Sequence, residues 1–110
     1  MTSNAVSVIL PVLNEEDYLV HAVEAILQQK FTGQIEVLLS IGPSIDRTMQ
    51  VAEELAKKDS RVRIIENPTG RTAAGLNLAI KHSKFPVIVR VDGHSNIPEN
   101  YIEQIGRAHV

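Results

Sequence analysis

The sequence predicts an α/β fold in which helices cover both faces of a mostly parallel sheet. Four apolar runs of strand length alternate with segments whose apolar residues recur at helical spacing. This alternation is typical of parallel strands joined by right-handed crossovers. The last run, residues 87–91, is rich in Val and Ile, as expected of a strand buried on both faces. With 110 residues, 44% of them hydrophobic, the chain can form one packed domain.

The first half of the chain contains two strand–helix pairs. The first strand is expected over residues 6–13, and Asn14 can cap the helix that follows, with three acidic residues favouring its positive end. Apolar residues at helical spacing continue until Gly33 marks the exit. The second strand is expected over 35–41, and Asp46 can cap the next helix. The inner face of that helix is expected to carry Ile45, Met49, Ala52, Leu55 and Ala56.

The second half of the chain follows the same order of elements. A third strand is expected over 62–65, a helix over about 72–82 and a fourth strand over 87–91. Pro98 suits the first position of a last helix. No repeat, linker or low-complexity segment divides the chain, so we expect one domain over residues 1–110. Because the chain ends without a strong helix stop, soon after its best candidate site, we expect this domain to be truncated at its C-terminus.

The composition argues against several classes of function. The formal net charge is −2 with both signs interspersed, and only 4% of residues are aromatic, so we expect no nucleic-acid partner. The absence of cysteine excludes a disulfide framework, a thiolate nucleophile and a cysteine zinc site. The first apolar run is too short to span a membrane. We expect a cytoplasmic protein, which would reach the cytoplasmic face of a membrane only through parts outside this chain.

Three polar clusters follow three of the expected strands, at residues 14–16, 44–46 and 92–94. The carboxyl ends of parallel strands meet at one edge of the sheet, where ligands of such folds bind. Each cluster also has a purely structural interpretation, with Asn14 and Asp46 as helix caps and His94 as a surface turn residue. Their coincidence at one edge favours an acidic crevice, in which Gly93 lets Asp92 and His94 converge on one cation.

A fourth element, residues 70–72, is a glycine turn that presents Arg71 at the start of a helix. Free backbone N–H groups together with a guanidinium suit a diphosphate. Taken alone, the element is explained more simply as a turn with a solvated arginine. The sequence has no P-loop, no Gly-x-Gly-x-x-Gly after a strand and no nucleophile elbow. His21, His82 and His109 show no metal-ligand spacing.

Taken together, these segments resemble the nucleotide-binding half of a family 2 glycosyltransferase with the GT-A fold. Residues 89–94 resemble the form found in bacterial exopolysaccharide transferases of the succinoglycan type. The resemblance implies a Rossmann-like, three-layer α/β/α half of a GT-A domain. It is carried by residues 6–16, 36–39, 44–48, 70–77 and 89–94.

The resemblance implies an inverting transferase of the hexosyltransferase type, with a nucleotide-diphospho-sugar as donor and a saccharide or lipid-linked acceptor. The residues expected to bind the donor are Pro11, Val12, Asn14, Glu15, Asp46, Arg71 and Asn77. Of these, the first four would line the nucleoside pocket, and Arg71 would lie near the phosphates. Asp92 and His94 fall on the Asp-x-Asp motif that holds Mg²⁺ or Mn²⁺ against the diphosphate.

Two departures from the family pattern limit what the resemblance implies. Ile41 and Gly42 stand where the family often has paired acids, one of which contacts uracil, so the base of the nucleotide stays open. His94 replaces the second acid of the metal motif, which favours softer metals such as Mn²⁺. The family's catalytic base and acceptor-binding segments lie beyond residue 110, so we expect these residues alone to bind a donor without transferring its sugar.

Two other classes of function stay open at this point. The main alternative is a non-catalytic α/β interaction module that keeps the sheet without a working site. A phospho-acceptor receiver domain fits less well, because the adjacent acids it needs after the first strand are replaced by Asn14 and an expected helix start. If part of the sheet is missing from this chain, the exposed edge would pair with other chains, so we also expect homo-oligomers.

Overall fold

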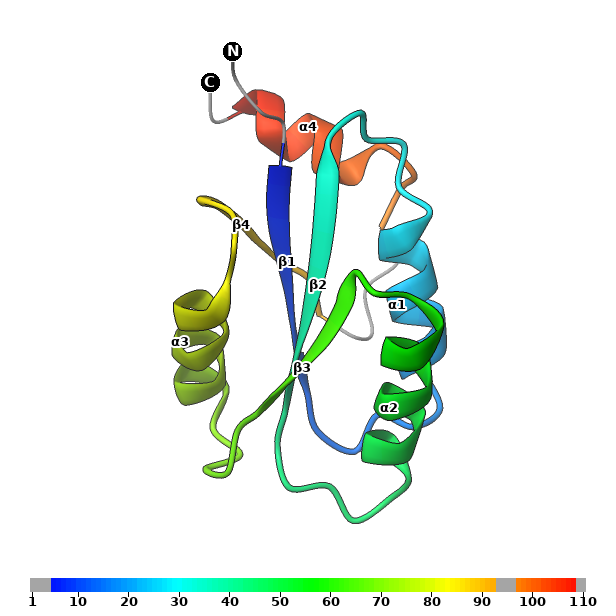
Figure 1. Cartoon of the computed structure of the whole chain (residues 1–110), viewed down its shortest axis with the longest axis vertical. Helices are drawn as coiled ribbons and strands as arrows, with labels where there is room; N and C mark the ends of the chain where they lie inside the picture. The colour runs from blue at the N-terminus through cyan, green and yellow to red at the C-terminus, as the bar shows by residue number, and fades with distance from the viewer. Residues whose placement is uncertain (1–4, 93–96, 109–110) are drawn as a thin grey trace.

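The computed structural model describes residues 5–92 and 97–108, with side chains described as far as residue 105. Strands and helices alternate along the chain (Figure 1). In order they are β1 (Ala5–Val12), α1 (Leu19–Leu27), β2 (Gln34–Ile41), α2 (Thr48–Lys58), β3 (Val62–Glu66), α3 (Thr72–His82), β4 (Val87–Arg90) and α4 (Tyr101–Ala108). Within these described ranges, no helix combines the length and the apolar character that crossing a bilayer requires.

The four strands form one parallel sheet in the order β3-β2-β1-β4. β1 and β2 are the central pair, and nearly every residue of both is buried, which explains their continuous runs of Val, Ile and Leu. The register places Pro11 beside Ser40 and Ile9 beside Arg90. The carboxyl ends of the strands therefore meet at one edge of the sheet, and the expected parallel α/β fold is confirmed.

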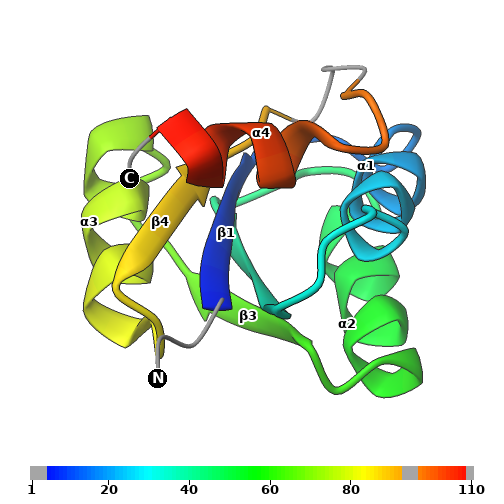
Figure 2. The ribbon, with the colours of Figure 1, turned by 90° about the horizontal axis from the view of Figure 1, so that it is seen from above.

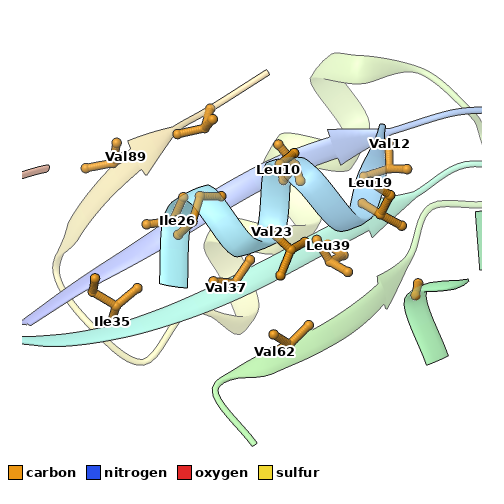
Figure 3. Packing of buried hydrophobic residues seen from close by; sticks show 14 of the residues in the cluster. Leu10, Val12, Leu19, Val23, Ile26, Ile35, Val37, Leu39, Val62 and Val89 are labelled. Atoms are coloured by element: carbon orange, nitrogen blue, oxygen red, sulfur yellow. The ribbon is translucent and has the colours of Figure 1, made fainter. Parts of the chain in front are cut away.

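Helices cover both faces of the sheet (Figure 2). On one face, side chains of α1, α2 and α4 share a large apolar cluster with the strands, in which Leu10 of β1 lies with Val23 of α1 (Figure 3). On the opposite face, Ile9 belongs to a smaller cluster with Ala79 of α3. Successive residues of β1 thus point to opposite faces, as in any strand buried on both sides. The three layers implied by the family resemblance are present.

Two helices begin later than their expected first residues. α1 begins at Leu19, so the prediction that Asn14 caps this helix is wrong. Asn14 instead has a positive φ of 52°, and its side chain accepts a hydrogen bond from the backbone N–H of Ile45 (2.9 Å). α4 begins at Tyr101, so Pro98 is not its first residue but lies just before it, with its carbonyl accepting from the Tyr101 N–H (3.1 Å).

The loop between β2 and α2 differs from two predictions, those for Ile45 and Asp46. Ile45 was expected on the inner face of the helix but is 96% exposed, because α2 begins only at Thr48 and Ile45 belongs to the loop. Asp46 is not the N-cap of α2 either, because Arg47 holds that position, but the Asp46 carboxylate accepts a hydrogen bond from the N–H of Thr48 (3.0 Å), the first residue of the helix. Of the other residues expected on that face, Ala52 is fully buried.

The amino edge of the sheet is held together by one buried acid, Glu36 of β2. Its carboxylate accepts hydrogen bonds from Ser7 Oγ (2.6 Å), the backbone N–H of Lys84 (2.6 Å) and Arg63 Nη1 (3.0 Å). Ser7 Oγ in turn accepts from the N–H of Phe85 (3.2 Å). Burial raises the pKa of Glu36, but the three hydrogen bonds outweigh burial and hold the pKa below its ordinary value. This carboxylate therefore links β1, β2, β3 and the segment before β4.

Candidate functional site

The carboxyl edge of the sheet carries a cleft of about 280 Å³. Every strand contributes to it, through its last residues or through the segment that follows. This is the position at which open parallel sheets bind their ligands. The lining residues are Pro11, Val12, Leu13, Glu15, Ser40, Asn67, Gly70, Thr72, Arg90 and Asp92.

The loop after β1 is joined beside this cleft to the loop after β2 and the first residue of α2 by four hydrogen bonds, which we call the loop clamp. Backbone N–H groups of the loop after β1 donate to side chains of the segment after β2, and the Ile45 N–H donates in the other direction, to Asn14 Oδ1. The clamp fixes the wall of the cleft that carries Glu15. Its other three bonds join Asn14 N to Ser44 Oγ (3.0 Å), Glu15 N to Thr48 Oγ1 (2.8 Å) and Glu16 N to Asp46 Oδ2 (3.3 Å).

Asp46 is the residue whose carboxylate takes part in the loop clamp. The hydrogen bond from the Thr48 hydroxyl is the largest cause of a lowered pKa at Asp46, and the backbone N–H groups of Thr48 and Glu16 add to it against a smaller effect of burial. The carboxylate is therefore ionised at neutral pH. Asp46 is not one of the cleft-lining residues in the described part of the chain.

Asn67 organises the turn between β3 and α3. Its side chain is nearly inaccessible to solvent (4% exposed), and its Nδ2 donates to the carbonyl of Arg71 (2.8 Å) while its Oδ1 accepts from Thr69 Oγ1 (2.7 Å). Gly70, with a φ of 68°, supplies the left-handed residue that this turn requires. The turn places Gly70 and Thr72 in the cleft and Arg71, which is exposed, between them at the start of α3.

Gly75 lets α3 approach the sheet closely enough to form this wall. A Cβ at that position would lie 2.6 Å from Ser40 Oγ and 2.7 Å from Asn67 Nδ2, too close for any ordinary contact. Ser40 Oγ instead donates to the carbonyl of Gly75 (2.9 Å). The first turn of α3 is thereby fixed against β2 and the end of β3, with its N-terminus at the cleft, where an anion is favoured.

Arg90 and Asp92 form an ion pair at the open side of the cleft. Nε and Nη2 of Arg90 both donate to Oδ1 of Asp92, at 3.3 and 3.2 Å. Both side chains are more than half exposed, at 51% and 62%. The pair is therefore accessible to a ligand that enters from solvent.

The described residues supply one carboxylate, Asp92, at the place where the metal was expected. In the part of the chain that the structure describes, no group of three or more His, Cys, Asp or Glu residues could hold a metal ion. The second expected ligand, His94, lies outside the described residues. A carboxylate is a suitable donor for Mg²⁺ or Mn²⁺, which take their remaining ligands from phosphate oxygens and water. The donor chemistry fits a cation that binds together with a diphosphate.

The structure brings together some of the predicted site residues but not all. Pro11, Val12, Glu15 and Asp92 line the cleft. Asn14 and Arg71 are neighbours of lining residues in the sequence, whereas Asp46 contacts Glu16 and Thr48, which do not line the cleft. Asn77 is not in the cleft and faces a separate hollow on α3 with Leu78, Ile80 and Lys81. The contacts that each of these residues makes with a donor stay a prediction.

Four lining residues were not singled out as site residues from the sequence, namely Leu13, Ser40, Asn67 and Arg90. Ser40 is concealed within an apolar strand, and Asn67 was interpreted only as part of a turn. Arg90 could have been found, because a charged residue in an apolar run, two positions before Asp92, must lie on the same side of its strand.

Residues 7–108 match the family described as glycosyl transferase family 2. The chain is 27% identical over 107 residues to the succinoglycan biosynthesis protein ExoA of Rhizobium meliloti (strain 1021), an alignment that covers 96% of this chain and 32% of that protein. It is 33% identical over 104 residues to glycosyltransferase GlyG of Streptococcus pneumoniae serotype 4, covering 94% and 34%. The chain thus spans about a third of the length of these relatives.

Solved structures show the same fold. TarS 1–349 of S. aureus in complex with UDP-GlcNAc superposes with a TM-score of 0.74 at 25% identity, covering 94% of this chain and 30% of that one. The mannosyltransferase PcManGT from Pyrobaculum calidifontis, in complex with GDP-Man and Mn²⁺, gives a TM-score of 0.74 at 24% identity, covering 84% and 28%. The GT-A half implied by the sequence resemblance is confirmed. With its family match over nearly its whole length and this fold, the chain belongs to glycosyl transferase family 2.

Proposed function

We propose that this chain is the donor-binding part of an inverting glycosyltransferase that moves a sugar from a nucleotide-diphospho-sugar to a saccharide or lipid-linked acceptor during exopolysaccharide synthesis. Membership of glycosyl transferase family 2 supports sugar transfer in general. The observation that carries the proposal is the cleft at the carboxyl edge, where the start of α3 and the Arg90–Asp92 pair lie beside the end of β1.

The relatives support the donor and the metal. One of them is named for succinoglycan biosynthesis. Among the structures, TarS was solved with UDP-GlcNAc, and PcManGT with GDP-Man and Mn²⁺. These proteins carry different bases and sugars on one fold, so we expect a nucleotide sugar and a divalent cation here without assigning the base, the sugar or the metal.

The cleft residues divide into two groups by their chemistry. Residues 11–15 would hold the nucleoside, on a wall that the loop clamp fixes. Residues 70–72 would face the diphosphate, where helix N–H groups and the Arg71 guanidinium favour negative charge. A divalent cation held by Asp92, with His94 as the expected second ligand, would neutralise charge on the departing nucleoside diphosphate. The chain's own contribution is to bind and orient the donor.

The catalytic base and the acceptor site are proposed to lie in a longer protein of which these residues are the first part of the GT-A domain. The matched relatives are about three times as long as the chain, which supports this proposal. Self-association through an edge of the sheet, such as β4 in the described residues, and attachment to a membrane through other segments also stay predictions.

Calorimetry of UDP, GDP and ADP binding, each with Mn²⁺, Mg²⁺ or no metal, tests the proposal. We expect at least one nucleoside diphosphate to bind with a metal, and a hundredfold excess over Kd to stabilise the fold by about 2.7 kcal/mol. Asp92→Ala should abolish the metal-dependent part of binding. Asp59→Ala is the matched control, because Asp59 also pairs with an arginine two residues away but stands outside the cleft.

Two results would contradict the proposal in different ways. If none of the three nucleotides binds with either metal, the non-catalytic interaction module becomes the better interpretation. If the 110-residue chain transfers sugar by itself, donor binding is correct, but the proposed position of the catalytic base outside the chain is wrong.

A further inference from the structure

Arg90 and Asp92 leave β4 on the same face of the sheet. Val89 and Val91 are buried in the large cluster with α1, and residues alternate along a strand, so positions 90 and 92 belong to the face that carries α3. The Val91 N–H donates to the carbonyl of Ile9 (3.0 Å), so strand geometry continues past Arg90. The two side chains therefore enter the cleft on the side that also holds the start of α3.

The contact between Arg90 and Asp92 is a loose one. Both hydrogen bonds from the guanidinium end on the same carboxylate oxygen, at more than 3 Å. The pair formed by Arg61 and Asp59 differs, because Nε and Nη2 of Arg61 reach both carboxylate oxygens, one at 2.7 Å, and its backbone N–H adds a further bond. Two-oxygen pairing is the stronger arrangement. A competing ligand can therefore displace Arg90 from Asp92 more easily than it can displace Arg61 from Asp59.

The charges of the cleft residues and of the expected ligands indicate what would displace Arg90 and what it would bind next. The charged lining residues in the described part of the chain are Glu15 and Asp92, which are acidic, and Arg90, which is basic. Without a ligand, the guanidinium of Arg90 neutralises Asp92. A divalent cation on the same carboxylate would repel that guanidinium, whereas a diphosphate beside the start of α3 would attract it and match its planar set of donors.

We infer that Arg90 is an internal counter-ion of Asp92. A divalent cation that binds Asp92 displaces the Arg90 guanidinium, and the displaced guanidinium then binds the diphosphate of the donor. The inference rests on the proposed function and adds a residue and an order of events to it. Arg90 thus has opposite effects on the two ligands. It competes with the cation for Asp92, and it attracts the diphosphate once the cation is in place.

The two effects differ in size. An exposed ion pair contributes little, so removal of Arg90 should tighten the binding of Mn²⁺ alone by about two- to fivefold. Hydrogen bonds to a charged group are stronger, so the same change should weaken binding of UDP or GDP at saturating Mn²⁺ by about tenfold. The loss should be the same for both nucleotides, because the guanidinium contacts the diphosphate and not the base.

Arg90→Gln provides the test, with Arg61→Gln as matched control outside the cleft. The affinity for Mn²⁺ without nucleotide is measured by water-proton relaxation, and nucleotide affinity at saturating Mn²⁺ by calorimetry. Thermal unfolding followed by circular dichroism checks that each variant is folded. Arg90→Lys keeps the positive charge but loses the planar donors, so it should leave Mn²⁺ binding within about twofold of the wild type and still weaken nucleotide binding.

Changes of opposite sign in Arg90→Gln, with Arg61→Gln unchanged, are the expected result. If Arg90 had a purely structural role, Arg90→Gln would weaken binding of both Mn²⁺ and the nucleotide. That outcome, or no change in either affinity, would overturn the inference and leave the proposed function intact. Tighter Mn²⁺ binding with an unchanged nucleotide affinity would overturn the diphosphate contact. A wild-type chain that binds no nucleotide with any metal would instead overturn the proposed function.

Discussion

Replacing Gly75 by alanine tests how closely α3 must approach the sheet to form the cleft. The added Cβ would lie 2.6 Å from Ser40 Oγ and 2.7 Å from Asn67 Nδ2. Both of these side chains are buried and hydrogen bonded, Ser40 to the carbonyl of Gly75 and Asn67 to that of Arg71. Neither side chain can turn away without losing its bond, so the first turn of α3 has to move outwards.

Two opposing effects set the size of the change. Alanine favours the helix by about 1 kcal/mol relative to glycine. Against this, an overpacked contact costs about 1–3 kcal/mol, and disturbing two buried hydrogen bonds costs about 1 kcal/mol each. The net expectation is a loss of about 2–4 kcal/mol in the free energy of unfolding, together with weaker nucleotide binding because the start of α3 leaves its place.

Urea unfolding measures this loss, and Ala73→Gly, at an exposed position in the same helical turn, is the control. That control should cost about 0.5–1 kcal/mol from helix propensity alone and leave the cleft intact. Ser40→Ala combined with Gly75→Ala removes one of the two close contacts, so the double variant should be more stable than the sum of the single changes predicts. A Gly75→Ala variant as stable as the wild type, or strict additivity with Ser40→Ala, would refute the reasoning.

Two further substitutions test the loop clamp and the amino edge of the sheet. Asn14→Ala removes the acceptor of the Ile45 N–H and strains a residue with positive φ, so it should lower the free energy of unfolding by about 1–2 kcal/mol, and Asn14→Gly, which relieves the strain, should lower it less. If urea unfolding shows that Asn14→Ala and Asn14→Gly lower the free energy of unfolding equally, backbone strain at position 14 does not contribute. Glu36→Gln should cost about 2–3 kcal/mol at pH 7, because the hydrogen bonds to Glu36 are made to a charged group. The pKa of Glu36 is lowered in the folded state, so its contribution to the free energy of unfolding is complete above the ordinary pKa of 4.5 and is lost as the pH falls through the lower folded value. The free energy of unfolding measured between pH 6 and 3 should therefore fall less steeply in Glu36→Gln than in the wild type.

The strands and the helix order could be predicted because they depend on residue patterns that are local. Residues 35–41 are apolar except for Glu36 and Ser40, as expected of a strand covered on both faces, and the structure shows that all of them are buried. The prediction that the polar clusters after three strands lie at one edge of the sheet required only that the strands be parallel. The lining of the cleft by Glu15 and Asp92 is the result of that topology.

The predictions that were wrong concern residues whose partners are far away in the sequence. Asn14 has the side chain of a helix cap, but its partner is the N–H of Ile45, 31 residues away, and this contact holds it in the loop instead. Ile45 has a helical spacing to the residues that follow, yet the clamp keeps it outside α2. The role of Asn77 in donor binding stays a prediction. Family resemblance gives its position in a helix but not the direction of its side chain, which borders a separate hollow on α3 in the structure.

The position of β1 in the middle of the sheet has a consequence for how the chain is made. β1 gains one neighbour when β2 is complete at Ile41, but its other neighbour, β4, ends only at Arg90. At roughly 5–20 residues per second, a ribosome needs about 2–10 s to make the intervening segment of about 50 residues. During that time the nascent chain presents the unpaired edge of an eight-residue strand without any charged residue to other chains in the cell. The bonds from the N–H groups of Lys84 and Phe85 to Glu36 and Ser7 hold the segment just before β4 against β1 and β2. We therefore expect that weakening these bonds lowers the yield of soluble protein during synthesis.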